Sequence, residues 1–328
     1  MSLRLTLAVL ALLIAGGAVA LRVGEGGGGG SHAAVPAAAP KPRPLPPPPY
    51  GAGAAPVRVS MRFKHPPRSG ELFDLRTGRV LWSRMPTRGQ PVASLAKMMT
   101  AIVVADRSRD SELVYVSRRA RAEPGSAVGL LPPHRRVSLR LLLYGLLLPS
   151  GNDAAVALAE HVAGSVPRFV ALMNAEGRRL GLRCSHFSSP DGYQDTGNRS
   201  CARDLAVLAR EVLRRPRLAR IVRTRYISFP SLLPHIAKVH GHKKTVWKPG
   251  RLYLASHNPL LLDRYPGATG IKTGFTDGAG RCLVGTARRG RLELGVVLLH
   301  SHDPGGQAMR ILNRGFTALR RAGAAPAR

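Results

Sequence analysis

The chain has 328 residues, 44% of them hydrophobic, so it is long and apolar enough to bury a sizeable core, and wholesale disorder is excluded. Its formal net charge is +32, supplied mostly by arginine because only eight lysines occur, and a coding bias towards arginine gives this pattern as readily as selection for a polyanion. Aromatic residues are only 5% and no nucleic-acid-binding motif is present, so we expect no nucleic-acid partner but association with a membrane surface or an anionic cell wall.

Residues 5–21 form an uninterrupted apolar run between Arg4 and Arg22. The length of this run falls between that of a signal-peptide core and that of a membrane span, so we interpret residues 1–22 as a signal peptide or an N-terminal membrane anchor. Residues 23–56 begin with a glycine run that ends in Ser31 and continue with a stretch rich in alanine and proline, which predicts a Gly/Ser and Ala/Pro-rich linker. The chain is therefore expected to be exported, to the cell wall or the outer face of the cytoplasmic membrane.

Residues 57–320 are expected to form one folded domain, followed by a disordered tail at 321–328. Apolar patterning predicts strands at 57–63, 71–75, 79–83, 282–288 and 291–299, and helices at 94–106, 139–148, 153–163, 166–180, 202–214 and 307–319. Strands at both ends of the domain with helices between them predict an α+β fold whose ends join in one sheet. Apolar and polar residues alternate less in the last two predicted strands than in a half-exposed strand, so both faces of that sheet should be covered.

Three cysteines occur, Cys184, Cys201 and Cys282, without C-x-x-C spacing or a neighbouring histidine cluster. This pattern predicts no metal site. Export would permit a disulfide between Cys184 and Cys201, but three buried thiols are an equally good interpretation because connectivity cannot be read from sequence. Cys282 lies in an apolar predicted strand and is expected in the core.

Ser94 opens an apolar predicted helix, and Lys97 follows three residues later on the same helical face. A serine needs a base to become a nucleophile, and a lysine kept neutral by burial can be that base. The pair alone also fits an ordinary helix start, with Ser94 as the N-cap and Lys97 as a surface cation.

Two later motifs strengthen the catalytic interpretation. Ser150-Gly151-Asn152 follows an apolar helix, and Lys272-Thr273-Gly274 precedes the last predicted hairpin. The order S-x-x-K, S-x-N, K-T-G is typical of penicillin-recognising serine acyl-transferases. Ser256-His257-Asn258 also fits S-x-N but lies close to the third motif, so we favour Ser150 and expect Asn258 to structure the approach to Lys272.

With these motifs the chain resembles the low-molecular-weight penicillin-binding proteins of the D-alanyl-D-alanine carboxypeptidase family, from about residue 70 to residue 316. The matching blocks lie at residues 93–101, 148–155, 186–193 and 270–276. The resemblance implies a β-lactamase/transpeptidase-like fold, in which an antiparallel sheet is flanked by helices beside an all-helical subdomain, in a single catalytic domain without cofactors. Ala96 stands where many members have threonine, Ser189 where asparagine is frequent, and Cys201 where a small hydroxyl residue is, so the geometry of the 184–201 loop is in question.

The resemblance also implies the reaction. Ser94 would attack the carbonyl between two D-alanines of a peptidoglycan stem peptide, giving an acyl-enzyme that water hydrolyses, and β-lactams would inhibit covalently. Lys97 would take the serine proton, which requires an amine kept neutral by burial and by Lys272. Ser150 would relay a proton to the leaving amine, and Asn152 would hydrogen-bond the substrate amide.

Four further roles follow from the same resemblance. Lys272 and Thr273 would bind the terminal carboxylate of the substrate, which selects C-terminal D-alanine. Gly274 would let the substrate backbone approach the strand. The backbone N–H groups of Ser94 and Phe275 would form the oxyanion hole.

Three other functions remain open. A D,D-endopeptidase of cross-linked peptidoglycan also cleaves after a D-configured residue. A class A β-lactamase needs a glutamate near the site for deacylation, whereas glutamates after Ser150 fall on predicted helices or a strand and Glu123 precedes the second motif. A catalytically silent wall-binding scaffold would have no need of Ser94, Lys97 and Lys272.

Overall fold

The computed structural model describes residues 57–133, 135–193, 197–239 and 242–324, all within one compact unit, Ala38–Arg328. Residues 1–22, predicted as a signal peptide or anchor, and the predicted linker 23–56 lie outside the described residues. The strands are β1 (Ser69–Asp74), β2 (Val80–Arg84), β3 (Gln90–Pro91), β4 (Leu113–Tyr115), β5 (Arg136–Ser138), β6 (Arg199–Ser200), β7 (Tyr226–Val239), β8 (His242–Ala255), β9 (Ala268–Gly274), β10 (Cys282–Arg289) and β11 (Leu292–Leu299). The helices are the 3₁₀ turn η1 (Ala93–Ala96), α1 (Lys97–Ala105), α2 (Arg118–Arg121), α3 (Leu139–Leu147), α4 (Asn152–Ala163), α5 (Val166–Arg179), α6 (Ala202–Arg214), α7 (Pro216–Val222), α8 (Pro259–Leu262) and α9 (Pro304–Ala324).

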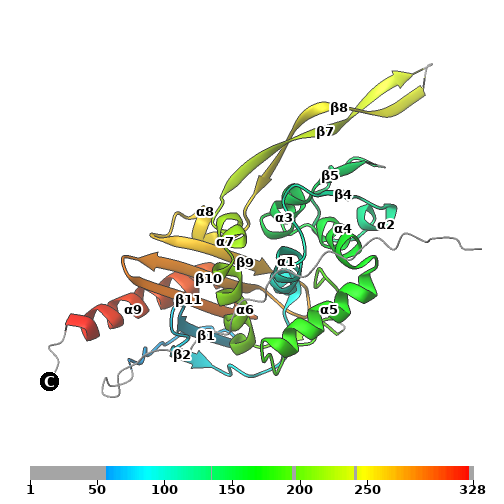
Figure 1. Ribbon diagram of the computed structural model, residues 1–328. Coiled ribbons are helices and arrows are strands. Elements are labelled where there is room, and N and C mark those ends of the chain that lie inside the picture. Colours follow the sequence, from blue (N-terminus) through cyan, green and yellow to red (C-terminus); the bar gives the residue numbers. More distant parts are fainter. Residues whose placement is uncertain (1–56, 134, 194–196, 240–241, 325–328) are drawn as a thin grey trace, which may run out of the picture. The chain divides into compact units, whose positions relative to one another are not determined.

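The main sheet has five strands in the order β2-β1-β11-β10-β9, and each neighbouring pair is antiparallel (Figure 1). The early hairpin β1–β2 therefore lies beside the late hairpin β10–β11, with Leu72 opposite Val296. This arrangement confirms the expected α+β fold with both ends of the domain in one sheet.

Alternate residues of the sheet strands enter two different cores. Leu72 and Val296 point towards α9, where they join Ile311 and Phe316 in one buried cluster. The next residues along the same strands point to the opposite face and join the helices there in a second, larger cluster. Both faces of the sheet are covered, as predicted, because a strand alternates its side chains between faces.

The all-helical subdomain is built around α1, α3, α4 and α5. Met98, Met99 and Ile102 of α1 are completely buried, and α3 is buried along nearly its whole length. Hydroxyl caps begin two of the helices: Ser138 Oγ accepts from Leu141 N at α3, and Ser165 Oγ accepts from Arg168 N at α5. These caps fix the starts of two helices of this subdomain.

Two predicted segments differ from the structure. Residues 57–63 do not form a strand, because only one backbone bond, from Val59 N to Leu81 O (2.9 Å), joins them to the edge of the sheet. Their apolar side chains pack instead on the cluster beneath α9. Helix α9 extends to Ala324, so the tail predicted from residue 321 does not begin there, and residues 325–328 lie outside the described part of the chain.

Sequence patterning missed the ribbon formed by β7 and β8, two strands of 14 residues each that pair only with one another in the described chain. The prolines at 230, 234 and 249 argue against a central strand, since proline cannot donate to a ladder. An isolated ribbon has two free edges, where a missing N–H group is tolerated.

No single helix among the described residues is both long and apolar enough to cross a membrane, and only the bent pair α4 and α5, taken together, meets those criteria.

Candidate active site

Ser94 sits on the 3₁₀ turn η1, and the regular helix α1 begins only at Lys97. The helix predicted over 94–106 is thus divided at its start. Ala93, just before the serine, has a φ of 50°, in the left-handed region that non-glycine residues rarely occupy. Backbone strain of this kind clusters at functional sites and costs roughly 1–3 kcal/mol. Here it presents the Ser94 side chain to the pocket described below.

The Lys97 ammonium is completely buried and donates to three oxygens. The acceptors are Ser94 Oγ at 2.9 Å, Asn152 Oδ1 at 2.6 Å and the backbone carbonyl of Asp191 at 2.8 Å. The S-x-x-K spacing therefore brings the amine to the serine hydroxyl, as helix geometry allowed. It is not the surface cation of an ordinary helix start.

This coordination orients the lone pair of a neutral Lys97. An ammonium has three N–H groups, and losing one leaves two donors and a lone pair. If the two donors keep Asn152 and Asp191, the lone pair points at the Ser94 hydroxyl. Burial lowers the pKa of Lys97 to about 8, opposed by the nearby carboxylates of Asp191, Asp153 and Glu123. A substantial neutral fraction is therefore accessible near neutral pH.

Asn152 begins α4, and both ends of its carboxamide are engaged. Its Oδ1 accepts from Lys97, and its Nδ2 donates to the carbonyl of Pro124 at 2.6 Å. The residue is buried. Sequence reasoning expected Asn152 to bind the substrate amide, whereas in this structure its carboxamide holds the Lys97 amine.

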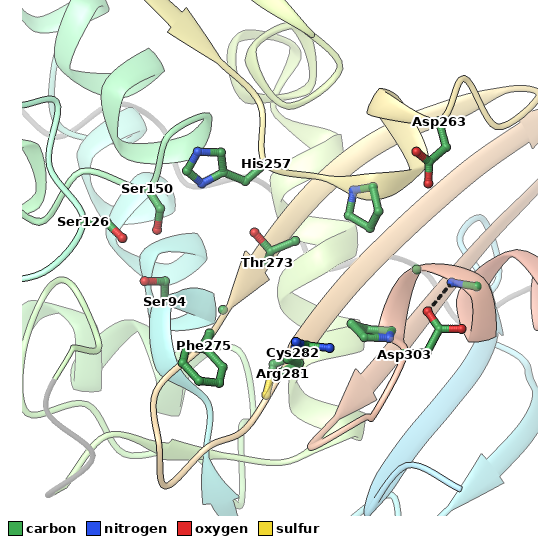
Figure 2. Close-up of a pocket in the computed structure, with 15 residues that line it drawn as sticks. Ser94, Ser126, Ser150, His257, Asp263, Thr273, Phe275, Arg281, Cys282 and Asp303 are labelled. Atoms are coloured by element: carbon green, nitrogen blue, oxygen red, sulfur yellow. Dashed lines mark hydrogen bonds between the residues drawn. The ribbon is translucent and has the colours of Figure 1, made fainter. Parts of the chain in front are cut away.

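Ser150 is the least constrained of the predicted catalytic groups. Its φ of 69° is again left-handed, and its buried hydroxyl has no hydrogen-bond partner within the described residues. The side chain lines the pocket on the same side as Ser94 (Figure 2). An unengaged hydroxyl in this place is available to a ligand.

Strand β9 carries the third motif into the site. Lys272 is buried and donates to the carbonyl of Thr273 at 2.9 Å, while Thr273, Gly274 and Phe275 line the pocket. Burial, reinforced by the charge of Lys97, holds the pKa of Lys272 well below its usual range. The structure thus places two mutually repelling buried amines next to pocket-lining residues, Lys97 at Ser94 and Lys272 at Thr273, and an anionic ligand bound there would relieve that repulsion.

Gly274 allows β9 to pass close to the turn that carries the nucleophile. A Cβ at this position would lie 3.0 Å from the carbonyl oxygen of Val92 and 3.1 Å from the backbone nitrogen of Ser94. The glycine was predicted to admit the substrate backbone, and the structure gives it an additional role in packing the first motif against the third.

The pocket has a volume of about 520 Å³. It is lined by Ser94, Ser126, Ser150, His257, Pro259, Asp263, Thr273, Gly274, Phe275, Arg281, Cys282, Asp303, Pro304, Gly305 and Gly306. Figure 2 shows the three serines grouped on one side, with Thr273 on the strand that faces them and the two aspartates towards the far end. The three motifs, far apart in sequence, therefore meet at one cavity.

Sequence reasoning missed Ser126, and it treated His257 only as part of a discarded S-x-N match. Ser126 is held by its neighbours: its carbonyl accepts from Asn152 N at 2.6 Å, and Asp153 Oδ1 accepts from Val128 N at 2.9 Å. The sequence signal that could have located the Ser126 segment is Asp153, which directly follows the second motif. Asn258 caps α8 by accepting from Leu260 N at 3.0 Å, which fits its expected structural role.

The 184–201 loop is closed by a disulfide between Cys184 and Cys201, one of the two alternatives left open by the sequence. Inside it Ser189, in place of the frequent asparagine, bridges three groups: its hydroxyl donates to Asp191 Oδ1 (2.6 Å) and accepts from Gly192 N (3.0 Å) and Asn198 Nδ2 (2.9 Å). The loop therefore fixes the Asp191 carbonyl that receives Lys97.

Glu123 lies closer to the site than its sequence position indicated. Its side chain hydrogen-bonds Asp191, and burial together with the charge of Asp191 raises the pKa of Glu123. No glutamate is among the pocket-lining residues of the described chain. Because a carboxylate that acts as a deacylation base must face the cavity, Glu123 is poorly placed for the β-lactamase role.

The fold is shared with solved structures named as a DD-transpeptidase and a D-alanyl-D-alanine carboxypeptidase. The Streptomyces K15 DD-transpeptidase matches with a TM-score of 0.69 and 28% identity, covering 79% of this chain and 100% of that one. A D-alanyl-D-alanine carboxypeptidase of Mycobacterium tuberculosis matches with a TM-score of 0.66 and 31% identity, covering 81% of this chain and 95% of that one.

The sequence profile of the D-alanyl-D-alanine carboxypeptidases matches residues 64–303, and the chain belongs to that family. The D-alanyl-D-alanine carboxypeptidase DacD of Salmonella typhimurium is 34% identical over 258 residues, which cover 74% of this chain and 61% of that protein. The corresponding DacB2 of Mycobacterium tuberculosis is 34% identical over 237 residues, covering 72% and 75%. The chain thus spans about three fifths of DacD, the longer of these two relatives.

Proposed function

We propose that the chain is a serine-type D-Ala-D-Ala carboxypeptidase that trims peptidoglycan stem peptides through an acyl-enzyme on Ser94. The observation that carries the proposal is the bonding of Lys97, whose buried amine touches the Ser94 hydroxyl while two other acceptors hold it in place. The names of the related proteins support the same substrate class.

In the proposed mechanism neutral Lys97 removes the Ser94 proton as the oxygen attacks the scissile carbonyl. The developing oxyanion is stabilised by the backbone N–H groups of Ser94 and Phe275, each worth roughly 2.7–4 kcal/mol. Ser150 passes a proton to the leaving D-alanine, for which its unengaged hydroxyl is suited. Water then hydrolyses the ester, with Lys97 again acting as the base.

The substrate carboxylate is proposed to lie above Lys272, with Thr273 as its hydrogen-bond donor at the pocket wall. Binding an anion there restores the ammonium form of Lys272, whose pKa burial and Lys97 depress. Anchoring the terminal carboxylate in this way favours substrates with a free C-terminus over internal bonds.

We further propose that the protein acts outside the cytoplasm, at the wall or the outer face of the membrane, with residues 1–22 as signal or anchor and residues 23–56 as linker. The substrate class supports this location because peptidoglycan is extracytoplasmic. Detecting the chain by fractionation, with and without residues 1–22, tests it: cytoplasmic retention of the full chain would contradict the proposal.

Covalent labelling of the full chain with a fluorescent penicillin tests the nucleophile. We expect one long-lived adduct that is lost in Ser94→Ala and kept in Ser60→Ala, a control at an exposed serine. No adduct, or one that survives Ser94→Ala, would instead indicate a silent scaffold. Rapid repeated hydrolysis of the β-lactam would indicate a β-lactamase.

Assays on a pentapeptide stem and on a cross-linked dimer separate the remaining activities. We expect release of D-alanine from the pentapeptide and little cleavage of the dimer. The reverse preference would make the chain a D,D-endopeptidase. Because the similar Streptomyces protein is named a transpeptidase, the assay should include an amino-acid acceptor. If the acyl group is transferred mainly to this acceptor rather than to water, the proposed carboxypeptidase activity is contradicted.

A further inference from the structure

The β7–β8 ribbon extends away from the rest of the domain (Figure 1), and its distal half is largely exposed on both faces. Paired and alternate residues of a ribbon share a face, so residues at even positions 226–238 lie with their partners at odd positions 243–255. We call this the outer face. On the other face, Phe229, Leu252 and Leu254 are buried in the core at the base of the ribbon, which anchors the ribbon and leaves the outer face uncovered.

The outer face carries large apolar side chains that are largely exposed, although the Arg225 guanidinium lies over the Tyr226 ring. Tyr226, Tyr253 and Ile236 are 62%, 75% and 79% exposed, and Trp247 is partly exposed beside Pro234. Single exposed apolar residues need no explanation, but several on one projecting face indicate a contact surface.

The distal half of the ribbon is also strongly basic. It holds Lys238, Lys243, Lys244 and Lys248, half of the eight lysines in a chain whose other cations are nearly all arginine. All four are exposed or partly exposed. Residues 226–255 contain no aspartate or glutamate, so this charge is not neutralised within the ribbon. Lysines can extend their ammonium groups to phosphates while their stems cover apolar surface.

The composition of the ribbon favours a lipid surface as its partner over a polysaccharide or another protein chain. Residues 226–255 contain no asparagine or glutamine either, so the ribbon lacks the amides and carboxylates that would hydrogen-bond sugar hydroxyls. Pro230, Pro234 and Pro249 remove donors from both strand edges, which disfavours pairing with another chain. Aliphatic, tryptophan and lysine side chains together are typical of a lipid interface.

We propose that the distal half of this ribbon docks on an anionic phospholipid bilayer. Ile236 and Trp247 enter the headgroup region, and Lys238 and Lys243 on the same face lie among the lipid phosphates, while Lys244 and Lys248 on the opposite face add to the positive charge near the surface. The attraction to each lysine strengthens binding by about five-fold at an anionic surface, so the two on the outer face contribute about 25-fold at low salt. The contact would hold the catalytic domain at the membrane independently of residues 1–22.

Fluorescence of Trp247 in the full chain tests the proposal, because only two tryptophans occur and Trp82 can be replaced by phenylalanine. On vesicles containing phosphatidylglycerol with brominated acyl chains, we expect the Trp82→Phe protein to show a blue shift and at least two-fold quenching. Zwitterionic vesicles, or about 0.5 M salt, should abolish most of both changes. The Trp247→Phe protein, which reports only Trp82, should show neither.

Two matched variants assign the effect to the ribbon. Replacing Lys238, Lys243, Lys244 and Lys248 by glutamate should remove the quenching of Trp247. Replacing four exposed arginines elsewhere, Arg58, Arg62, Arg320 and Arg321, by glutamate makes the same charge change and should leave it within two-fold. Circular dichroism verifies that both variants fold.

Three results would overturn the proposal. Trp247 could stay unquenched while the chain sediments with the vesicles, so that another segment binds them. Quenching of Trp247 could persist in the lysine variant, which would mean that the four lysines do not contribute to binding. Trp247 could respond to soluble polyphosphate and not to vesicles, so that the ribbon takes an anionic polymer of the wall rather than a bilayer.

Discussion

The Nζ of Lys97 donates a 2.8 Å hydrogen bond to the backbone carbonyl of Asp191, 94 positions later in the chain. With the bond to Asn152, this contact leaves only one direction of the amine for Ser94. The geometry of the proposed base therefore depends on the 184–201 loop, a segment outside all three motifs. Three predictions concern Lys97 and the 184–201 loop around this contact, and a fourth concerns Glu71, a buried carboxyl group on β1.

The rate of Ser94 acylation by a β-lactam should rise with pH and level off above about 8, because Lys97 must be neutral and burial lowers its pKa to about 8. In Lys97→Arg the guanidinium keeps its proton, so the rate should fall by about 10²–10⁴-fold and lose this rise. Stopped-flow acylation measures both effects. Lys64→Arg, at an exposed lysine, is the control, and a wild-type rate in Lys97→Arg would refute the role of the base.

Gly192→Ala should abolish acylation. Gly192 has a φ of 73°, and a Cβ there would overlap the carbonyl oxygen of Ala93, so the turn next to Asp191 has to move. Gly181→Ala is the matched control: its φ of 72° imposes the same backbone strain, about 1–2 kcal/mol, but a Cβ meets nothing within 4 Å. Equal acylation rates in the two variants would mean that the position of Asp191 does not matter.

Removing the disulfide should destabilise the domain without removing the catalytic groups. Cys184 and Cys201 are separated by 17 residues, and cross-linking a loop of that length contributes about 3 kcal/mol. The double variant Cys184→Ser, Cys201→Ser should therefore unfold at a lower temperature. Dithiothreitol should lower the melting temperature of the wild type and leave that of the double variant unchanged. A reductant effect of equal size in both proteins would point to another cause.

Glu71 should make stability depend on pH. It is 2% exposed on β1, one carboxylate oxygen has no partner in the described chain, and burial raises its pKa from 4.5 to about 7, with Arg203 opposing. The folded state then holds the proton more tightly than the unfolded state, so stability is lost as pH rises from about 4.5 to above 7, by about 3 kcal/mol in total.

Glu71→Gln removes this titration. Urea unfolding at about pH 5 and at about pH 8 should show the variant gaining stability relative to wild type at the higher pH. A difference between the two proteins that is the same at both pH values would show that Glu71 does not titrate in this range.

The site could be predicted to the extent that its chemistry is local. Ser94 and Lys97 share a helical turn, so their contact follows from spacing alone. The motif order indicated that Ser150 and Lys272 would join them, and the structure places Ser150 in the pocket wall and buries Lys272 next to Thr273, which also lines the pocket. The contacts of Asn152, by contrast, depend on Lys97 and Pro124, and no spacing rule reveals them.

The strands of the sheet were predictable because their apolar side chains repeat at the period of a covered strand. The β7–β8 ribbon could not be predicted, because its prolines and its mixture of polar and apolar residues are typical of a loop sequence. The strand predicted at residues 57–63 was wrong for the opposite reason. These residues alternate like a strand, but only one backbone hydrogen bond joins them to the edge of the sheet.

The sequence by itself indicated the family and predicted the nucleophile and its neighbouring base, because these depend on residue types at fixed local spacings. Only the tertiary structure decided how Lys97 is held, that its pKa falls, and that Cys184 pairs with Cys201. The physical reason is that burial and long-range hydrogen bonds are properties of the packed chain. An amine becomes a base at neutral pH only where folding removes water from it and places acceptors from distant segments around it.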